Sequence, residues 1–274
     1  MGMCFLRILS SPYLRVPALR CIASIMKHFF FAQYRAAFLP GLIPVSEADH
    51  PLDRKIPFWP GKINIYLDFV AFWIRCLGFL LRNYGRRALE PDLNFIQTMG
   101  QLYAWAAEVY TRHLSTTDRP FYLGHPRFLP IHGLDPHLMC IPSLHVMVVI
   151  RTYTFFRQTL GIFAGEKAAA LSEELYRGAV AITEAVLYIK QHSVNCIPAA
   201  MYAMTRFEGN LFPPEEAERF TAELFKGEKL PSGQDAQEIR LHILSLYRRF
   251  LAEGKTAAHW TKPLLDFLAE LPPK

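Results

Sequence analysis

Apolar side chains recur every three or four residues along most of the chain, and this spacing places them on one face of a helix. The clearest run lies near the C-terminus and comprises Ile239, Ile243, Leu246, Tyr247 and Phe250. No segment shows the sustained alternation of apolar and polar residues that a half-buried strand requires. The sequence therefore predicts an all-α protein.

The chain has 274 residues, 51% of them hydrophobic, which is enough for one large domain with a substantial core. Three regions are expected: a basic amphipathic leader over 1–60, a helical core over 61–206, and charged C-terminal helices over 207–274 that pack on the core. Core helices are predicted at about 62–85, 93–113, 142–160, 166–190 and 192–206. Later helices are predicted at about 214–227, 235–253 and 261–270.

The first part of the chain is basic. Residues 1–46 contain Arg7, Arg15, Arg20, Lys27 and Arg35 but no Asp or Glu, and large apolar residues lie between these cations. A segment of this kind suits the surface of a membrane with anionic lipids. A cationic helix packed on the domain, or a cleaved organelle transit peptide, would have the same composition. All three interpretations remain open at this point.

The apolar segments are short for membrane spans. The longest charge-free stretches, 93–107, 136–150 and 191–205, each have fifteen residues. At about 1.5 Å per residue they are shorter than a bilayer core. Hydropathy therefore does not support full transmembrane spans, and we expect membrane association through a surface instead.

Cysteine and charge patterns limit the remaining classes. Five widely spaced cysteines without a C-x-x-C pair favour free thiols in a reducing, cytoplasmic compartment. His132 and His137 lie near His145, but no carboxylate-rich set accompanies them, so we expect no metal and no cofactor. The net charge is +6. No nucleic-acid-binding motif is present, so we expect no nucleic-acid partner.

Three short polar motifs follow one another through the middle of the chain. The first contains Arg112 and Arg119-Pro120, the second is Pro142-Ser143-Leu144-His145, and the third is Lys190-Gln191-His192. Arginine, lysine and serine can bind phosphate, and histidine can move protons or act as a nucleophile. Pro142 suits the first turn of a helix, whose free amides would add an anion site beside Ser143. The motifs together predict a phosphate site.

The order and spacing of these motifs resemble those of the type-2 phosphatidic acid phosphatase and haloperoxidase family, over roughly residues 95 to 205. The resemblance implies a helical bundle of that type, here with extra N- and C-terminal helices. It implies that His192 is a nucleophile that forms a phosphohistidine and that His145 protonates the leaving group. Arg112, Arg119 and Ser143 would then bind the substrate phosphate.

The third motif departs from the family pattern. Cys196 stands where the family carries an Asp that orients the nucleophile, and Val186 stands where it carries an Arg. Lys190 is the nearby cation, and Lys-Gln-His is similar to a branch that transfers phospho-head-groups between lipids. In a helix, Asn195 would share a face with His192 and could accept its hydrogen bond in place of the Asp.

These observations lead to one main hypothesis and two alternatives. The main hypothesis is a phosphatase or phosphotransferase acting on a lipid or other apolar phosphate monoester through a phosphohistidine. The first alternative is a catalytically impaired family member that serves as a membrane-surface binding or scaffolding protein. The second is head-group transfer between lipids. The expected partners are a phosphate-bearing lipid or small molecule and a membrane surface.

Overall fold

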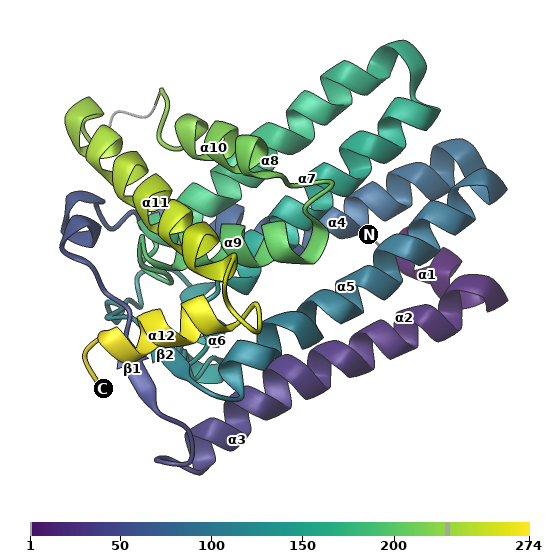
Figure 1. Ribbon diagram of the computed structural model, residues 1–274. Helices are drawn as coiled ribbons and strands as arrows, with labels where there is room; N and C mark the ends of the chain where they lie inside the picture. The colour runs from purple at the N-terminus through teal and green to yellow at the C-terminus, as the bar shows by residue number, and fades with distance from the viewer. Residues whose placement is uncertain (1, 228–230) are drawn as a thin grey trace.

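The computed structural model describes residues 2–227 and 231–274. Helices make up most of it, so the all-α prediction is confirmed (Figure 1). The α-helices are α1 (Gly2–Ser10), α2 (Pro12–Ile25), α3 (Ala32–Phe38), α4 (Ile63–Tyr84), α5 (Leu89–Tyr110), α6 (Phe128–Leu134), α7 (Leu144–Phe163), α8 (Ala168–Tyr188), α9 (Cys196–Glu208), α10 (Pro214–Glu223), α11 (Gly233–Gly254) and α12 (Lys262–Glu270). Shorter helical turns are η1 (Met26–Phe31), η2 (Pro51–Lys55), η3 (Pro60–Lys62), η4 (Gly85–Ala88) and η5 (Gly165–Lys167).

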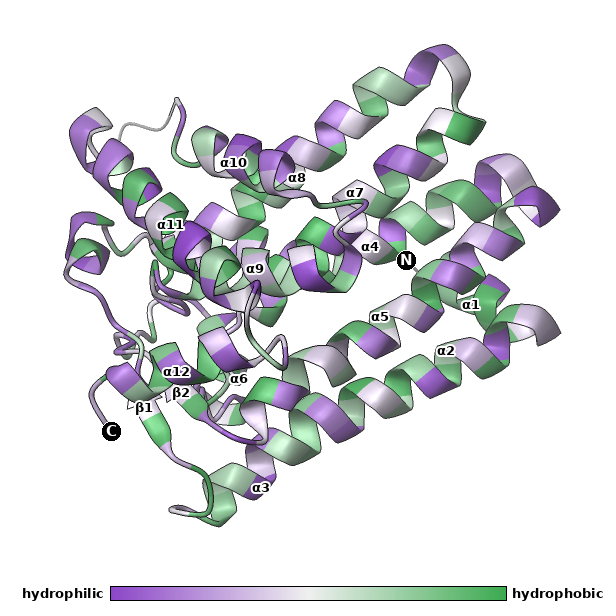
Figure 2. Ribbon diagram, in the orientation of Figure 1, coloured by the Kyte–Doolittle hydropathy of each residue, from purple (hydrophilic) through white to green (hydrophobic). Residues whose placement is uncertain are grey.

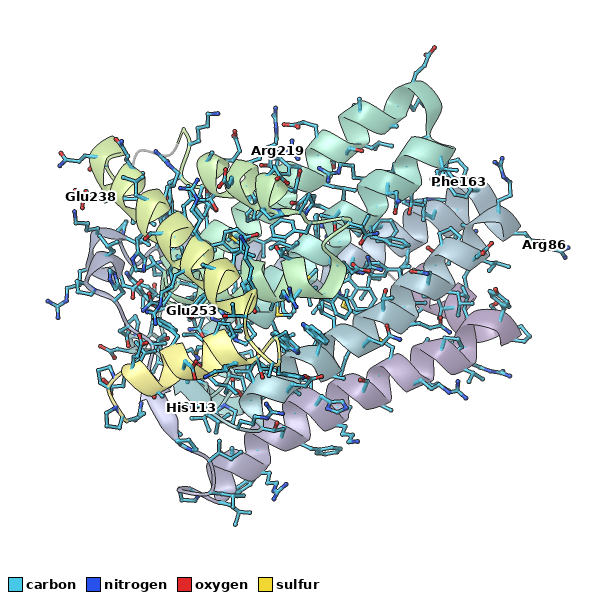
Figure 3. The ribbon with its side chains drawn as sticks, in the orientation of Figure 1. Arg86, His113, Phe163, Arg219, Glu238 and Glu253 are labelled. Atoms are coloured by element: carbon cyan, nitrogen blue, oxygen red, sulfur yellow. The ribbon has the colours of Figure 1, made fainter. Side chains whose placement is uncertain are left out.

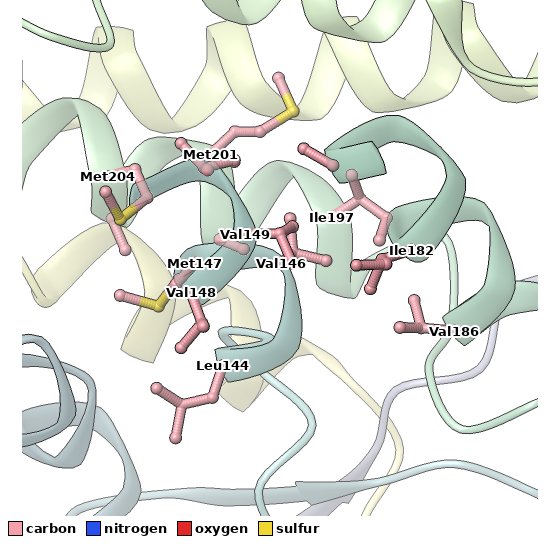
Figure 4. Packing of buried hydrophobic residues seen from close by; sticks show 14 of the residues in the cluster. Leu144, Val146, Met147, Val148, Val149, Ile182, Val186, Ile197, Met201 and Met204 are labelled. Atoms are coloured by element: carbon pink, nitrogen blue, oxygen red, sulfur yellow. The ribbon is translucent and has the colours of Figure 1, made fainter. Parts of the chain in front are cut away.

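Helix α7 is the centre of the core. Fourteen of its twenty residues are buried, and they pack against α8 and α9. Figure 4 shows residues of these three helices, among them Val149, Ile182 and Met201, gathered in one cluster. One charged side chain, Arg151, is fully buried among them. It donates to Glu208 Oε2 at 2.6 Å and to Thr98 Oγ1 at 2.5 Å, because an unpaired charge in such a place would be very costly.

The N-terminal segment forms a long, nearly continuous helix. Helices α2, η1 and α3 continue one another from Pro12 to Phe38, and α2 and η1 lie along α5 (Figure 1). The helix continues because no glycine interrupts it, and Pro17 is accommodated within it. Leu14 and Cys21 are buried against the domain. The opposite side is exposed and includes Leu19 and Ile22. In Figure 2 hydrophobic and hydrophilic residues are interspersed along α2.

A small parallel sheet, which the sequence did not predict, joins distant parts of the chain. Strand β1 (Val45–Glu47) pairs with β2 (Leu114–Thr116). On the other side of β1, Glu47 N donates to Pro272 O at 2.8 Å, and Lys274 N donates to Val45 O at 3.0 Å. The leader, the segment after α5 and the C-terminal residues therefore meet beside one another.

Within the described residues, one helical stretch is long and apolar enough to cross a membrane by length and composition. It covers 60–110, and 33% of its most apolar window is buried. The stretch includes both α4 and α5, and the chain turns between them at Gly85, which adopts a φ of 55°. This is weak evidence for membrane association, since core helices of soluble proteins pass the same test.

Candidate functional site

The second motif forms the start of α7. Ser143 is the N-cap residue, and its fully buried hydroxyl accepts a hydrogen bond from Val146 N at 3.4 Å. The Tyr110 hydroxyl donates to the carbonyl of Pro142 and fixes the approach to the helix. His145 lies in the first turn, where its ring packs on Tyr66 of α4 with ring centroids 4.6 Å apart. The predicted helix start is present, and the Ser143 hydroxyl caps it.

The third motif forms the turn after α8. The amides of Gln191 and His192 both donate to Val186 O, at 3.0 and 3.2 Å, and Lys190 adopts a positive φ of 56°. This turn directs the His192 ring toward α7. His192 Nε2 lies 3.2 Å from His145 Nδ1, so one of the two atoms donates to the other. The two histidines singled out in the sequence, 47 residues apart, are in direct contact.

A carboxylate from the leader fixes the chain just after His192. Asp53 Oδ2 accepts from the Ser193 hydroxyl at 2.6 Å, and Asp53 Oδ1 accepts from Val194 N at 2.8 Å. The same carboxylate accepts from His50 N at 2.7 Å and so caps η2. Sequence reasoning missed Asp53. The only local signal was the capping pattern of a polar residue, a proline and an acid at the start of η2.

Arg119 is bonded to the turn that carries His192, but its guanidinium already forms an ion pair with Asp135. Its guanidinium donates to Asp135 Oδ2 at 3.2 Å and to the Asp135 carbonyl at 2.7 Å. It also donates to Gln191 Oε1 at 3.1 Å, which connects it to the turn that carries His192. Asp135 was not identified from the sequence, although it stands two residues before His137 in the polar loop. The segment between β2 and α7, which includes α6, therefore borders the histidines through Asp135 and His137.

Lys190 points away from the pair to the leader. Its Nζ donates to the carbonyls of Asp53 and Ile56, each at 2.5 Å. Burial lowers its pKa, and the carboxylates of Asp53 and Asp49 act in the opposite direction. The lysine therefore anchors η2 to the third motif.

Two predicted site residues lie elsewhere. Arg112 donates to Thr261 Oγ1 at 3.1 Å, in the C-terminal region, and it does not line the histidine cavity. Asn195 donates to the carbonyl of Ala48 at 3.1 Å, and its Oδ1 accepts from His242 Nε2 at 2.8 Å. Asn195 thus does not make the expected contact with His192. The buried His192 Nδ1 makes no hydrogen bond within the described part of the chain.

Burial keeps both paired histidines neutral. It lowers the pKa of His192 well below its ordinary value, helped by His145 and His137, while Asp135 and the nearby Cys140 backbone oppose it. Burial also lowers the pKa of His145 to about 4. His137 differs: burial opposes its charge, but Cys140 and Asp135 beside it raise the pKa to about 9. The centre therefore combines two neutral imidazoles with a charged imidazolium nearby.

Two cavities adjoin His192. The first, between the two histidines and Asp135, has a volume of about 20 Å³, which is room for about one water molecule. The second has a volume of about 750 Å³ and opens on the leader side. Its charged lining comprises Glu47, Asp49, Asp53, Asp118, Arg54 and Lys190. The larger cavity is thus more acidic than the phosphate site that the sequence predicted.

No group of three or more His, Cys, Asp or Glu side chains that could hold a metal ion occurs among residues 2–227 and 231–274. The five cysteines are free thiols.

Comparison with known proteins gives no relative: no family model, no curated protein and no solved structure matches this chain.

Proposed function

We propose that the protein is a phosphatase or phosphotransferase, built on a helical bundle of the phosphatidic acid phosphatase and haloperoxidase type. Its substrate would be a phosphate monoester of a lipid or another apolar alcohol. The observation that carries the proposal is the contact of 3.2 Å between His192 Nε2 and His145 Nδ1. The second and third motifs, which the sequence pointed to as parts of a phosphate site, supply one histidine each. The two rings are in contact through nitrogen atoms that can exchange a proton.

In the proposed reaction, neutral His192 attacks phosphorus through Nε2, and the bond from phosphorus to the ester oxygen breaks. His145, in its charged form beside the bound phosphate, gives a proton to the leaving alcohol. Water then attacks phosphorus and gives a proton to His145, and the phosphorus–nitrogen bond breaks, which releases phosphate and restores both rings. The low pKa of His145 belongs to the empty site, since an adjacent phosphate dianion favours the charged ring.

The rings must separate for this reaction, because the space of about 20 Å³ beside them is too small for a phosphate. Arg119 donates to Gln191, the residue that precedes the proposed nucleophile in the chain. To bind phosphate it would exchange its bond to the Asp135 side chain for one to the substrate. Lys190, the cation of the third motif, would likewise have to give up its bonds to the carbonyls of Asp53 and Ile56. Ser143, assigned to phosphate by the resemblance, caps α7 beside the pair, whereas Arg112 lies in the C-terminal region and is left out of the proposed site.

A membrane surface is the proposed partner. The exposed side of the N-terminal helices carries large apolar residues, including Leu6, Leu19, Ile22, Phe31 and Phe38. Residues 1–46 supply five cations and no acids. This combination favours an anionic lipid surface and would bring an apolar substrate to the enzyme.

A second candidate function is a catalytically impaired binding or scaffolding protein at a membrane surface. The observation that favours it is that the cations near the histidines already have partners within the chain: Arg119 bonds Asp135, and Lys190 bonds two backbone carbonyls. The missing partner of His192 Nδ1 points the same way.

Phosphate release from phosphatidic acid and from p-nitrophenyl phosphate tests the two functions. We expect release by the wild type, loss in His192→Ala, and no change in His259→Ala, which alters an exposed histidine far along the chain. Equal rates in wild type and His192→Ala would remove the assigned nucleophile. Vesicle binding without release of phosphate from either substrate would favour the scaffolding function. Mass spectrometry of lipid products would reveal head-group transfer.

A further inference from the structure

A second cavity lies away from the histidines. It is a groove of about 700 Å³ between α4 and α8. Its walls are mostly apolar, with Phe72 and Leu80 from α4 and Leu175 and Ile182 from α8, and α7 contributes the buried Phe156 and Leu160. A cavity of this size and character is typical of a small-molecule site.

The groove runs along α4 from the histidine end of the domain to α1. Ile65 lines one end, and Phe79 lines the other. Phe79 is fourteen positions beyond Ile65, which corresponds to about 21 Å of helix. One leaflet of a bilayer core is about 15 Å thick, so the groove can hold one extended hydrocarbon chain.

The end of the groove at α1 is basic. Arg7 and Arg82 both line it, and neither forms an ion pair within residues 2–227 and 231–274. Cys4 and Gly78 show how close these helices lie, because a Cβ added to Gly78 would come within 3.3 Å of the Cys4 Cβ. Arg7 is three residues beyond Cys4, and Arg82 is four residues beyond Gly78, so helical spacing places both arginines on the facing sides.

Three other charged residues line the groove: Arg75 and Asp68, which pair with each other, and Glu174. Arg75 donates to both carboxylate oxygens of Asp68, at 2.6 and 2.5 Å, and the two charges neutralise each other. Glu174 lies on α8 and is exposed. The unpaired positive charge is therefore concentrated where α1 meets α4.

We propose that this groove binds an anionic single-chain amphiphile, such as a long-chain fatty acid. The head group would lie on Arg7 and Arg82, and the chain would extend along Leu175 toward Phe72 and Ile182. The mostly apolar walls favour a long hydrocarbon chain, and the two unpaired arginines at one end favour a negatively charged head group. This ligand is distinct from the proposed ester, since its charged group would lie at the opposite end from His145 and His192.

Titration calorimetry of the full chain with dodecanoate at pH 8 tests the site. We expect saturable binding of one dodecanoate, binding of dodecanol that is weaker by roughly 3- to 10-fold because ion pairs at exposed sites are modest, and no detectable binding of butanoate. Leu175→Glu places a carboxylate in the middle of the groove and should weaken dodecanoate binding by more than 10-fold. Ala170→Glu adds the same charge to the exposed side of α8 and should leave it unchanged.

A second pair of variants tests the head-group end. Arg7→Gln combined with Arg82→Gln should weaken dodecanoate to the level of dodecanol and leave dodecanol unchanged. The control combines Arg20→Gln with Arg86→Gln, which removes two exposed arginines outside the groove; Figure 3 shows Arg86 pointing away from the molecule.

Three results would overturn the proposal. They are the absence of saturable dodecanoate binding, equal binding by Leu175→Glu and Ala170→Glu, and unchanged affinity in the Arg7 and Arg82 double variant. A loss of dodecanoate binding in His192→Ala with no loss in that double variant would place the head group at the histidines and refute the assigned orientation. None of these results depends on whether the protein releases phosphate.

Discussion

A buried carboxylate should make the stability of this protein fall as pH rises. Asp92, in the first turn of α5, is fully buried, and neither of its side-chain oxygens has a hydrogen-bond partner in the described part of the chain. Burial raises its pKa from 3.8 to about 8. The partial positive charge at the helix start favours the ionised form, but the loss of hydration outweighs it.

The direction of this pH dependence follows from the number of protons that the folded and unfolded states bind. Between pH 4 and 8 the folded protein keeps a proton on Asp92 that the unfolded chain has released, so the free energy of unfolding decreases as pH rises through this range. At about 1.4 kcal/mol per pKa unit, the loss attributable to Asp92 between pH 5 and pH 8 is at most roughly 4 kcal/mol. Below pH 4 the contribution is constant.

Urea unfolding at pH 5 and pH 8 measures this effect. In Asp92→Asn the side chain stays neutral, so the stability difference between the two pH values should shrink by roughly 2–4 kcal/mol relative to wild type. Glu90→Gln, an exposed acid in the same turn, should retain the wild-type difference. If Asp92→Asn and the wild type lose the same free energy on going to pH 8, Asp92 is ionised in the folded state and the reasoning is wrong.

Three further predictions concern the core and the candidate site. Arg151→Ala leaves the Glu208 carboxylate half-buried without its partner and should cost about 3–5 kcal/mol, measured by urea unfolding. Asp53→Ala removes the acceptor for the two groups that follow His192 and should cost about 1–3 kcal/mol in the same assay. A carboxylate in Cys196→Asp should raise the rate of phosphate release if His192 is the nucleophile. An unchanged rate in the folded variant, compared with Cys196→Ser, would mean that the missing acid does not limit the site.

The long helices could be predicted because their signals are local. Those expected at about 62–85 and 142–160 correspond to α4 and α7, since apolar periodicity and the Pro142-Ser143 start are written in adjacent residues. The contact between His145 and His192 agrees with the motif order, because each histidine lies at the end of a core helix. Strands β1 and β2 could not be predicted, since three residues are too few to show alternation.

The hydrogen-bond partners of the site residues could not be predicted from the sequence. Asn195 would share a face with His192 only within a helix, but the helix expected from 192 begins at Cys196, and His242, 47 residues later, donates to the Asn195 oxygen instead. Asp53 acts on the third motif from 140 residues upstream, and nothing near His192 indicates it. Hydrogen bonds between such distant residues depend on how the helices pack, which short-range spacing does not encode.

The pairing around β1 has a consequence for biosynthesis. Val45 accepts a hydrogen bond from Lys274, and Ala48, just beyond the strand, accepts one from Asn195 beside the third motif. The ribosome synthesises Val45 long before Lys274. The helices between them can therefore fold before residues 272–274 leave the exit tunnel. The strand that supports the candidate site therefore gains its outer partner only after residues 272–274 have been synthesised. Until then its edge is open to pairing with other nascent chains.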